Sequence, residues 1–194
     1  QLLADGYLLY LNSDNEQPLS VHERDVFHWR IYFADLQRSL SMRLLQGVGG
    51  QEGKLVEDKL FTQNIEGALA AGVKVGVYIF SQAITVEEAV EEAEYILEAI
   101  RDWEVDMPIV YDWEYISEEA RTANMDARTL TDCSLHFCKL IEEAGYTPMV
   151  YGKKEWLIQK VELVLLSEYD IWLSQYEDIP DYPYKFSMWQ YSNK

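Results

Sequence analysis

The sequence predicts an α/β fold of the (β/α) barrel kind, because two stretches share one order of signals: an amphipathic helix, a glycine and a short apolar strand. In the first, an apolar stripe at helical spacing precedes Gly72, and residues 73–80 are mostly apolar. In the second, Phe137 and Ile141 share a helical face before Gly145, and residues 147–151 form the strand. Such units place helices outside a mostly parallel sheet.

A third helix is expected between these units, over residues 86–103. Thr85 and Glu88 form a capping box at its start, and apolar residues recur at helical spacing along its length. Its other face carries five glutamates that we expect to form a solvated surface: Glu87, Glu88, Glu91, Glu92 and Glu94. The acidity of this helix therefore indicates no ligand.

Three more strands are expected at residues 108–114, 170–176 and 186–191, and each ends in polar and aromatic side chains. Strand ends of this chemistry suit the catalytic rim of a barrel. Residues 1–24 are predicted to be a hairpin-like lead-in segment, and residues 25–194 one domain without an internal linker.

The composition is that of a globular protein with one domain: 194 residues, of which 48% are hydrophobic and 13% aromatic. The net charge of −18 creates a field that repels nucleic-acid phosphates and anionic membrane surfaces. No apolar stretch approaches the roughly 20 residues that span a bilayer. We therefore expect no nucleic-acid partner and no membrane span, and because residue 1 is Gln1 we expect any export signal or anchor upstream.

Cys133 and Cys138 both fall in the helix predicted before Gly145. Five positions along a helix place the two thiols on different faces and about 7.5 Å apart in rise, which is poor geometry for a disulfide. Only His136 lies nearby, which leaves too few ligands for a zinc site. We expect two buried thiols, no disulfide and no metal.

The chemistry is expected at the end of the strand at residues 108–114. Residues two apart in a strand point to the same side, so Asp112 and Glu114 share a face, with their Cα atoms about 6.6 Å apart. Proximity in a partly dry cleft leaves one carboxyl group of such a pair protonated beside an ionised partner, as glycoside cleavage requires. The alternative is an ordinary exposed strand end, in a chain with 34 acidic residues.

Aromatic residues near the predicted strand ends favour the functional interpretation, because aromatic faces pack on the apolar faces of pyranose rings. Part of this set is expected to pack in the core instead. The candidates for a sugar-binding cleft are Tyr78, Tyr151, Tyr176, Trp172, Trp189 and Tyr191.

The runs FTQNIEGALAAGVKVGVYIFSQA, MPIVYDWEYIS, IWLSQY and MWQYS resemble glycoside hydrolase family 25, the Chalaropsis-type lysozymes, in the same order and over about residues 53–192. The resemblance implies a flattened, irregular TIM-like barrel. It also implies a muramidase, which cleaves the β-1,4 link between N-acetylmuramic acid and N-acetylglucosamine in peptidoglycan. The expected partner is a peptidoglycan glycan strand, and the protein is expected to be a monomer that acts outside the cell or at the wall.

By this resemblance Asp112 and Glu114 are catalytic, with Glu114 as the general acid. Tyr78 corresponds to the aromatic residue of a Gly-x-Tyr strand, and Trp189 and Gln190 belong to a late Trp-Gln-Tyr element. With Tyr151 and Tyr176 they are the predicted substrate-binding residues. Asp112 would stabilise positive charge or orient the substrate's 2-acetamido group, which leaves retention and inversion both open. No cofactor is expected, because these steps need only carboxylates.

Two departures from the family pattern bear on activity. The first strand of the family reads Asp-Val-Ser, followed by Gln-Gly and Ile-Asp-Trp, whereas this chain has DVFHWRIYFADL from Asp25. Asp25 is the third catalytic candidate, and residues 21–48 are either diverged or damaged by a reading-frame slip. The family's later strand with an Asp-x-Asn motif is missing before Lys194, so we expect a catalytic domain truncated at its C-terminus.

These departures leave two alternatives to an active muramidase. One is a catalytically impaired, peptidoglycan-binding remnant. The other is a fragment that cannot close its barrel and aggregates through open sheet edges.

Overall fold

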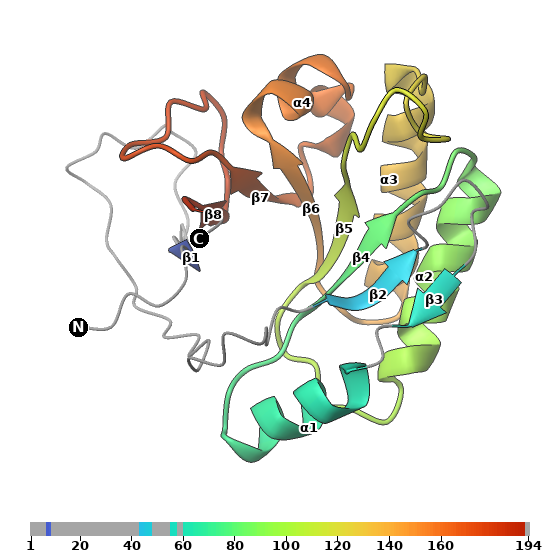
Figure 1. Cartoon of the computed structure of the whole chain (residues 1–194), viewed down its shortest axis with the longest axis vertical. Helices are drawn as coiled ribbons and strands as arrows, with labels where there is room; N and C mark the ends of the chain where they lie inside the picture. Colours follow the sequence, from blue (N-terminus) through green and yellow to red (C-terminus); the bar gives the residue numbers. More distant parts are fainter. Residues whose placement is uncertain (1–6, 9–42, 48–54, 58–59, 193–194) are drawn as a thin grey trace.

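The computed structural model describes residues 7–8, 43–47, 55–57 and 60–192, and shows the predicted mixed α/β fold (Figure 1). The elements in chain order are β1 (Tyr7–Leu8), β2 (Arg43–Gly47), β3 (Leu55–Glu57), α1 (Phe61–Ala70), β4 (Val77–Ser81), α2 (Val86–Ile100), β5 (Ile109–Trp113), α3 (Ala127–Glu143), β6 (Pro148–Lys153), α4 (Lys154–Gln159), the 3-10 helix η1 (Leu163–Leu166), β7 (Asp170–Ser174) and β8 (Met188–Gln190).

The described strands form one sheet in the order β1-β8-β7-β6-β5-β4-β2-β3. Five neighbouring strands, from β4 to β8, run parallel, and β2 continues parallel to β4. β1 and β3 pair antiparallel at the two edges. The sheet is therefore open within the described residues, and the predicted barrel is not confirmed.

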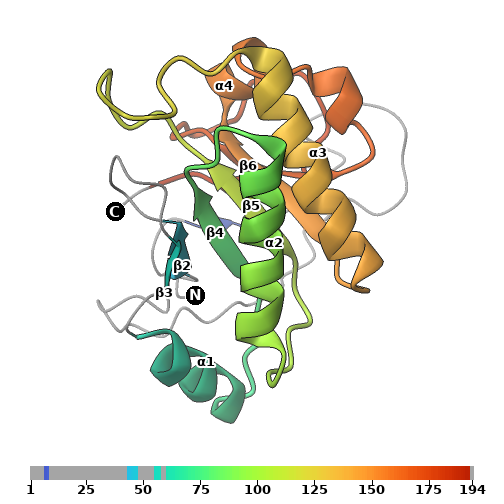
Figure 2. The same cartoon turned by 90° about the vertical axis from the view of Figure 1, so that its right-hand side faces the viewer.

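Helices α2 and α3 lie side by side and cover one face of this sheet (Figure 2). On that face β4 and β5 bury Ile79 and Tyr111, and the Tyr111 ring lies 5.0 Å from that of Phe137 in α3. The opposite face, called the inner face below, carries a second buried cluster: Val110, Met149, Tyr151, Trp172 and Met188. In Figure 1 β5 and β6 run upward side by side, and β6 leads directly into α4, so the ends of these two strands lie at the upper side of the view.

The predicted helix boundaries follow local chemistry. Gly72 (φ 69°) follows α1 and Gly145 (φ 88°) follows α3, and both adopt the left-handed conformation that glycine tolerates best. At the start of α2 the side chain of Thr85 accepts a hydrogen bond of 3.3 Å from the backbone N–H of Glu88. The strand predicted at residues 73–80 begins only at Val77. Before it, the carbonyl of Val75 accepts hydrogen bonds from the backbone N–H groups of Asp106 and Met107.

Cys133 and Cys138 are buried free thiols in α3, as the sequence predicts. Burial raises the pKa of Cys133 to about 12 and that of Cys138 further, so both are poor nucleophiles. Within the described ranges no helix has the length and apolar character needed to cross a membrane.

Candidate active site

Asp112 lies in β5 on the inner face, two residues after Val110 of the inner-face cluster. Its side chain is buried, with 8% exposure. Glu114 follows the strand directly, with a partly exposed side chain. Asp112 pairs in register with Tyr151 of β6, and Oε2 of Glu114 lies 3.5 Å from Nζ of Lys153, two residues further along the same face of β6. The structure therefore brings the two predicted catalytic carboxylates to one site, the first buried and the second at the rim.

The register of the strands extends this site across the sheet in two rows. In the lower row Asp112 pairs with Tyr151 of β6, which pairs with Trp172 of β7. In the upper row, one step closer to the strand ends, Lys153 pairs with Ser174, and Ser174 pairs with Gln190. Acidic, aromatic and amide groups thus follow one another on a single face.

Tyr151 connects the two rows. Its ring meets that of Trp172 edge to face at 5.0 Å, and its hydroxyl donates a hydrogen bond of 2.7 Å to Oε1 of Gln190. Burial, reinforced by the negative charges of Glu114 and Asp112, raises the pKa of Tyr151 well above its ordinary value. The hydroxyl therefore stays protonated and acts as a fixed donor.

Glu114 has a cationic neighbour that sequence reasoning missed. Nζ of Lys153 lies 3.5 Å from Oε2 of Glu114 and 4.6 Å from the centre of the Trp156 ring. Nothing in the sequence pairs residues 114 and 153, because their proximity depends on the register between β5 and β6.

The remaining predicted site residues do not all lie on the inner face. Tyr78 in β4 packs half-buried against the inner-face cluster, and Tyr176 lies just past β7 with 44% exposure. Trp189 belongs to the core on the helix-covered side, where its Nε1 donates a hydrogen bond of 2.8 Å to the carbonyl of Gln175. The structure therefore separates Trp189 from the inner-face group, and Asp25 lies outside the described residues.

The surface prediction for Glu92 is wrong: this residue is 4% exposed and lies beneath the end of β4. Its Oε1 accepts a hydrogen bond of 3.0 Å from the backbone N–H of Gln82, and burial raises its pKa to about 7. Glu92 follows Ala89 by three residues and precedes Ile96 by four, so it lies on the sheet-facing side of α2. This spacing is the sequence signal that indicates its burial. Beside it, Ser81 Oγ donates a hydrogen bond of 2.8 Å to the hydroxyl of Tyr111.

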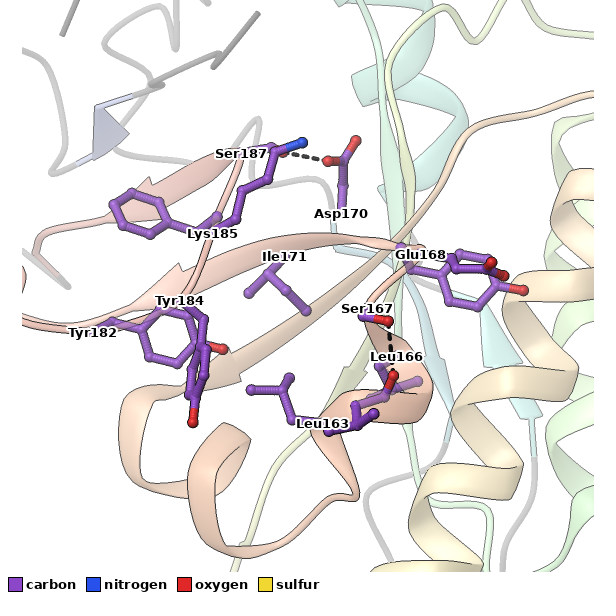
Figure 3. A pocket seen from close by; sticks show the side chains of 13 residues that line it. Leu163, Leu166, Ser167, Glu168, Asp170, Ile171, Tyr182, Tyr184, Lys185 and Ser187 are labelled. Atoms are coloured by element: carbon purple, nitrogen blue, oxygen red, sulfur yellow. Dashed lines mark hydrogen bonds between the residues drawn. The ribbon is translucent and has the colours of Figure 1, made fainter. Parts of the chain in front are cut away.

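A cavity of about 360 Å³ lies away from the carboxylates, at the amino end of β7 (Figure 3). Its walls are η1 on one side and the segment before β8 on the other, where Tyr182 and Tyr184 meet edge to face at 5.6 Å. Asp170 accepts a hydrogen bond from Ser187 at its rim. None of the predicted site residues lines this cavity.

Comparison with known proteins gives one family and several solved structures. A model of glycosyl hydrolases family 25 matches residues 48–194. The modular autolysin LytC from Streptococcus pneumoniae is 26% identical, with a TM-score of 0.61, and the match covers 71% of this chain and 34% of that chain. The modular Cpl-1 endolysin, solved with a peptidoglycan analogue, is 25% identical, with a TM-score of 0.54 and coverage of 71% and 40%.

A family 25 glycosyl hydrolase from Bacillus anthracis has a TM-score of 0.61 at 22% identity, with coverage of 74% of this chain and 64% of that chain, a likeness of fold alone. No curated protein sequence matches the chain. This chain thus spans about a third of the autolysin's length. Because the family model covers most of the sequence, including β5 and the strands that carry both rows of the site, the chain belongs to glycosyl hydrolases family 25.

Proposed function

We propose that this protein is a peptidoglycan hydrolase that cleaves the β-1,4 link between N-acetylmuramic acid and N-acetylglucosamine. The observation that carries the proposal is that Asp112 pairs in register with Tyr151 of β6, while Glu114 lies 3.5 Å from Lys153, two residues further along the same face of β6. Family membership supports glycoside hydrolysis. The solved complexes of LytC with a synthetic peptidoglycan ligand and of Cpl-1 with a peptidoglycan analogue support the substrate class.

In this mechanism the partly exposed Glu114 donates a proton to the leaving glycosidic oxygen. As the bond from the anomeric carbon to that oxygen breaks, positive charge develops on the sugar ring. Asp112, buried one row below, stabilises that charge through its own negative charge. Water then adds to the anomeric carbon and gives up a proton, which completes the hydrolysis. The steps use only carboxylates of the chain and water, so the proposal includes no cofactor.

The substrate is proposed to lie along the inner-face rim. Tyr78, Tyr151 and Tyr176 provide aromatic surface for sugar rings, and the Gln190 amide, oriented by Tyr151, provides polar contacts. For Trp189 we propose a supporting role instead of direct contact, because its ring is buried on the other side of β8. Asp25 remains a proposed third catalytic carboxylate.

We further propose that the open sheet is part of the flattened, irregular (β/α) barrel that the sequence predicts. The five parallel strands, and the helices that connect β4 to β5, β5 to β6 and β6 to β7, support this architecture. A monomer that acts outside the cell or at the cell wall accords with a peptidoglycan substrate.

The test measures the rate at which the chain releases reducing ends from purified peptidoglycan. We expect release by the wild type and its loss in Glu114→Gln, which keeps the shape of the side chain but has no acidic proton. Glu118→Gln, at an exposed position four residues further on, is the matched control and should retain full activity. Glycan binding without release by a cooperatively folded wild type would indicate an impaired binding remnant, and absence of a cooperative unfolding transition would indicate an incomplete fold.

A further inference from the structure

The end of β6 places a cation against the proposed acid. Nζ of Lys153 lies 3.5 Å from Oε2 of Glu114, and their side chains are 40% and 28% exposed. Lys153 follows Tyr151 by two residues and so points to the same inner face. The ammonium group therefore approaches Glu114 from the side of the neighbouring strand.

Two further contacts hold Lys153 in this place. Its ammonium lies 4.6 Å from the centre of the Trp156 ring, within the range of a cation–π interaction. Trp156 in turn meets Trp113, the residue before Glu114, edge to face at 5.5 Å. The junction of β6 and α4 thus contacts Trp113, the last residue of β5, and Glu114, the residue that follows it.

The backbone allows α4 to approach this closely because residue 152 is a glycine. A Cβ atom at Gly152 would lie 2.9 Å from Cγ and Cδ2 of Leu157, which is itself buried. The position of Lys153 at the junction of β6 and α4 is therefore set by tight packing.

The next residue, Lys154, is a matched control for Lys153. Its Nζ donates a hydrogen bond of 2.5 Å to Oδ1 of Asp181, in the segment between β7 and β8. The two lysines carry the same charge and are adjacent in the chain, but only Lys153 is ion-paired with Glu114 within the described residues.

We propose that Lys153 is a positioning residue for the hydrolytic step, acting through Glu114. Its ammonium lies beside Oε2 of Glu114, which leaves Oε1 to carry the proton for the glycosidic oxygen. This inference rests on the proposed function. It adds a residue that neither the motif comparison nor the predicted site contains.

The Oε1 proton moves to the glycosidic oxygen as the bond from that oxygen to the anomeric carbon breaks, so the leaving sugar departs as an alcohol and Glu114 becomes a carboxylate. The anomeric carbon gains a bond to an oxygen nucleophile, either water or the substrate's 2-acetamido oxygen, and water completes the hydrolysis. Negative charge on Glu114 thus grows in the transition state, next to an ammonium group that is already in place. An interaction that strengthens in the transition state raises kcat more than it changes KM.

The experiment measures kcat and KM for reducing-end release by four proteins: wild type, Lys153→Met, Lys153→Arg and Lys154→Met. We expect Lys153→Met to lower kcat about tenfold with KM changed less than about twofold, and Lys153→Arg to recover most of kcat. Lys154→Met removes the same charge and should leave kcat within about twofold of wild type. Equal kcat values for Lys153→Met and Lys154→Met would overturn the proposal, and so would a rise in KM with kcat unchanged.

The carboxyl ¹³C NMR signal of Glu114 gives a readout that does not require turnover. It should move in Lys153→Met and stay in place in Lys154→Met, and an unmoved signal in both would contradict the contact. An inactive wild type would instead refute the proposed function, and the positioning role with it. Activity in the wild type with no effect of Lys153→Met would refute the positioning role alone.

Discussion

The hydroxyl of Tyr151 in β6 donates a hydrogen bond of 2.7 Å to Oε1 of Gln190 in β8, across the intervening strand β7. The two residues are 39 positions apart in the chain, and both are buried. The bond therefore links β6, the strand next to β5, with the last described strand.

Replacing Tyr151 by Phe should lower the free energy of unfolding by about 1–3 kcal/mol, because the buried amide oxygen of Gln190 loses this donor. The ring contact with Trp172 is kept, so the loss reports on the hydroxyl. Urea unfolding measures the change. Tyr184→Phe, at an exposed position, is the control and should stay within about 0.5 kcal/mol of wild type. Equal stability of Tyr151→Phe and Tyr184→Phe would contradict the prediction.

The buried carboxyl group of Glu92 predicts a pH-dependent stability. Its pKa is about 7 in the folded protein against an ordinary value of 4.5, so the folded state binds more protons between these values. The free energy of unfolding should therefore fall as pH rises from 4.5 to 7, by about 3 kcal/mol, and level off above pH 7.

Glu92→Gln keeps an acceptor for the Gln82 N–H and cannot ionise, so this part of the pH dependence should vanish and stability at pH 8 should rise. Urea unfolding at pH 5, 6, 7 and 8 measures the free energy of unfolding of both proteins and its dependence on pH. Glu91→Gln changes the neighbouring exposed residue and should keep the wild-type slope. A wild-type slope in Glu92→Gln would show that Glu92 is ionised in the folded state throughout this range.

Replacing Tyr182 by Phe should stabilise the protein. The Tyr182 hydroxyl is buried and has no hydrogen-bond partner among the described residues, and burial raises its pKa. Tyr182→Phe removes a desolvated polar atom while the ring contacts with Tyr184 and Phe186 remain. The free energy of unfolding should rise by about 1 kcal/mol. A loss of stability in urea unfolding would mean that the hydroxyl has a partner in solution.

The net charge of −18 predicts how activity depends on salt. Bacterial walls are anionic, so the protein and its proposed substrate should repel each other at low ionic strength. The rate of peptidoglycan hydrolysis should rise between about 10 and 150 mM salt, because the screening length shortens. Small uncharged glycan fragments should show little change over this range. A steady loss of wall hydrolysis with salt would contradict this explanation.

Much of the secondary structure could be predicted from short-range chemistry. Gly72 and Gly145 mark the ends of α1 and α3, and the Thr85 cap marks the start of α2. The two-residue period of a strand also places Asp112 and Glu114 together. These features depend on residues close in sequence, and no knowledge of the sheet is needed.

Other features depend on helical spacing and on long-range packing. The acidic neighbours of Glu92 predict a surface position, although its spacing from Ala89 and Ile96 places it against the sheet. The same two-residue period puts Trp189 on the face opposite Gln190. The Lys153 contact with Glu114 depends on the β5–β6 register, and the edges of the sheet depend on β1 and β3, which local patterns do not predict.

The most direct test of the account is the identity of the sugar at the new chain ends. Peptidoglycan digested by the wild-type chain is reduced with borohydride, and the fragments are analysed by mass spectrometry. We predict reduced N-acetylmuramic acid at the new ends and no new ends with Glu114→Gln. Reduced N-acetylglucosamine at those ends, or release that persists in Glu114→Gln, would contradict a muramidase that uses Glu114 as its acid.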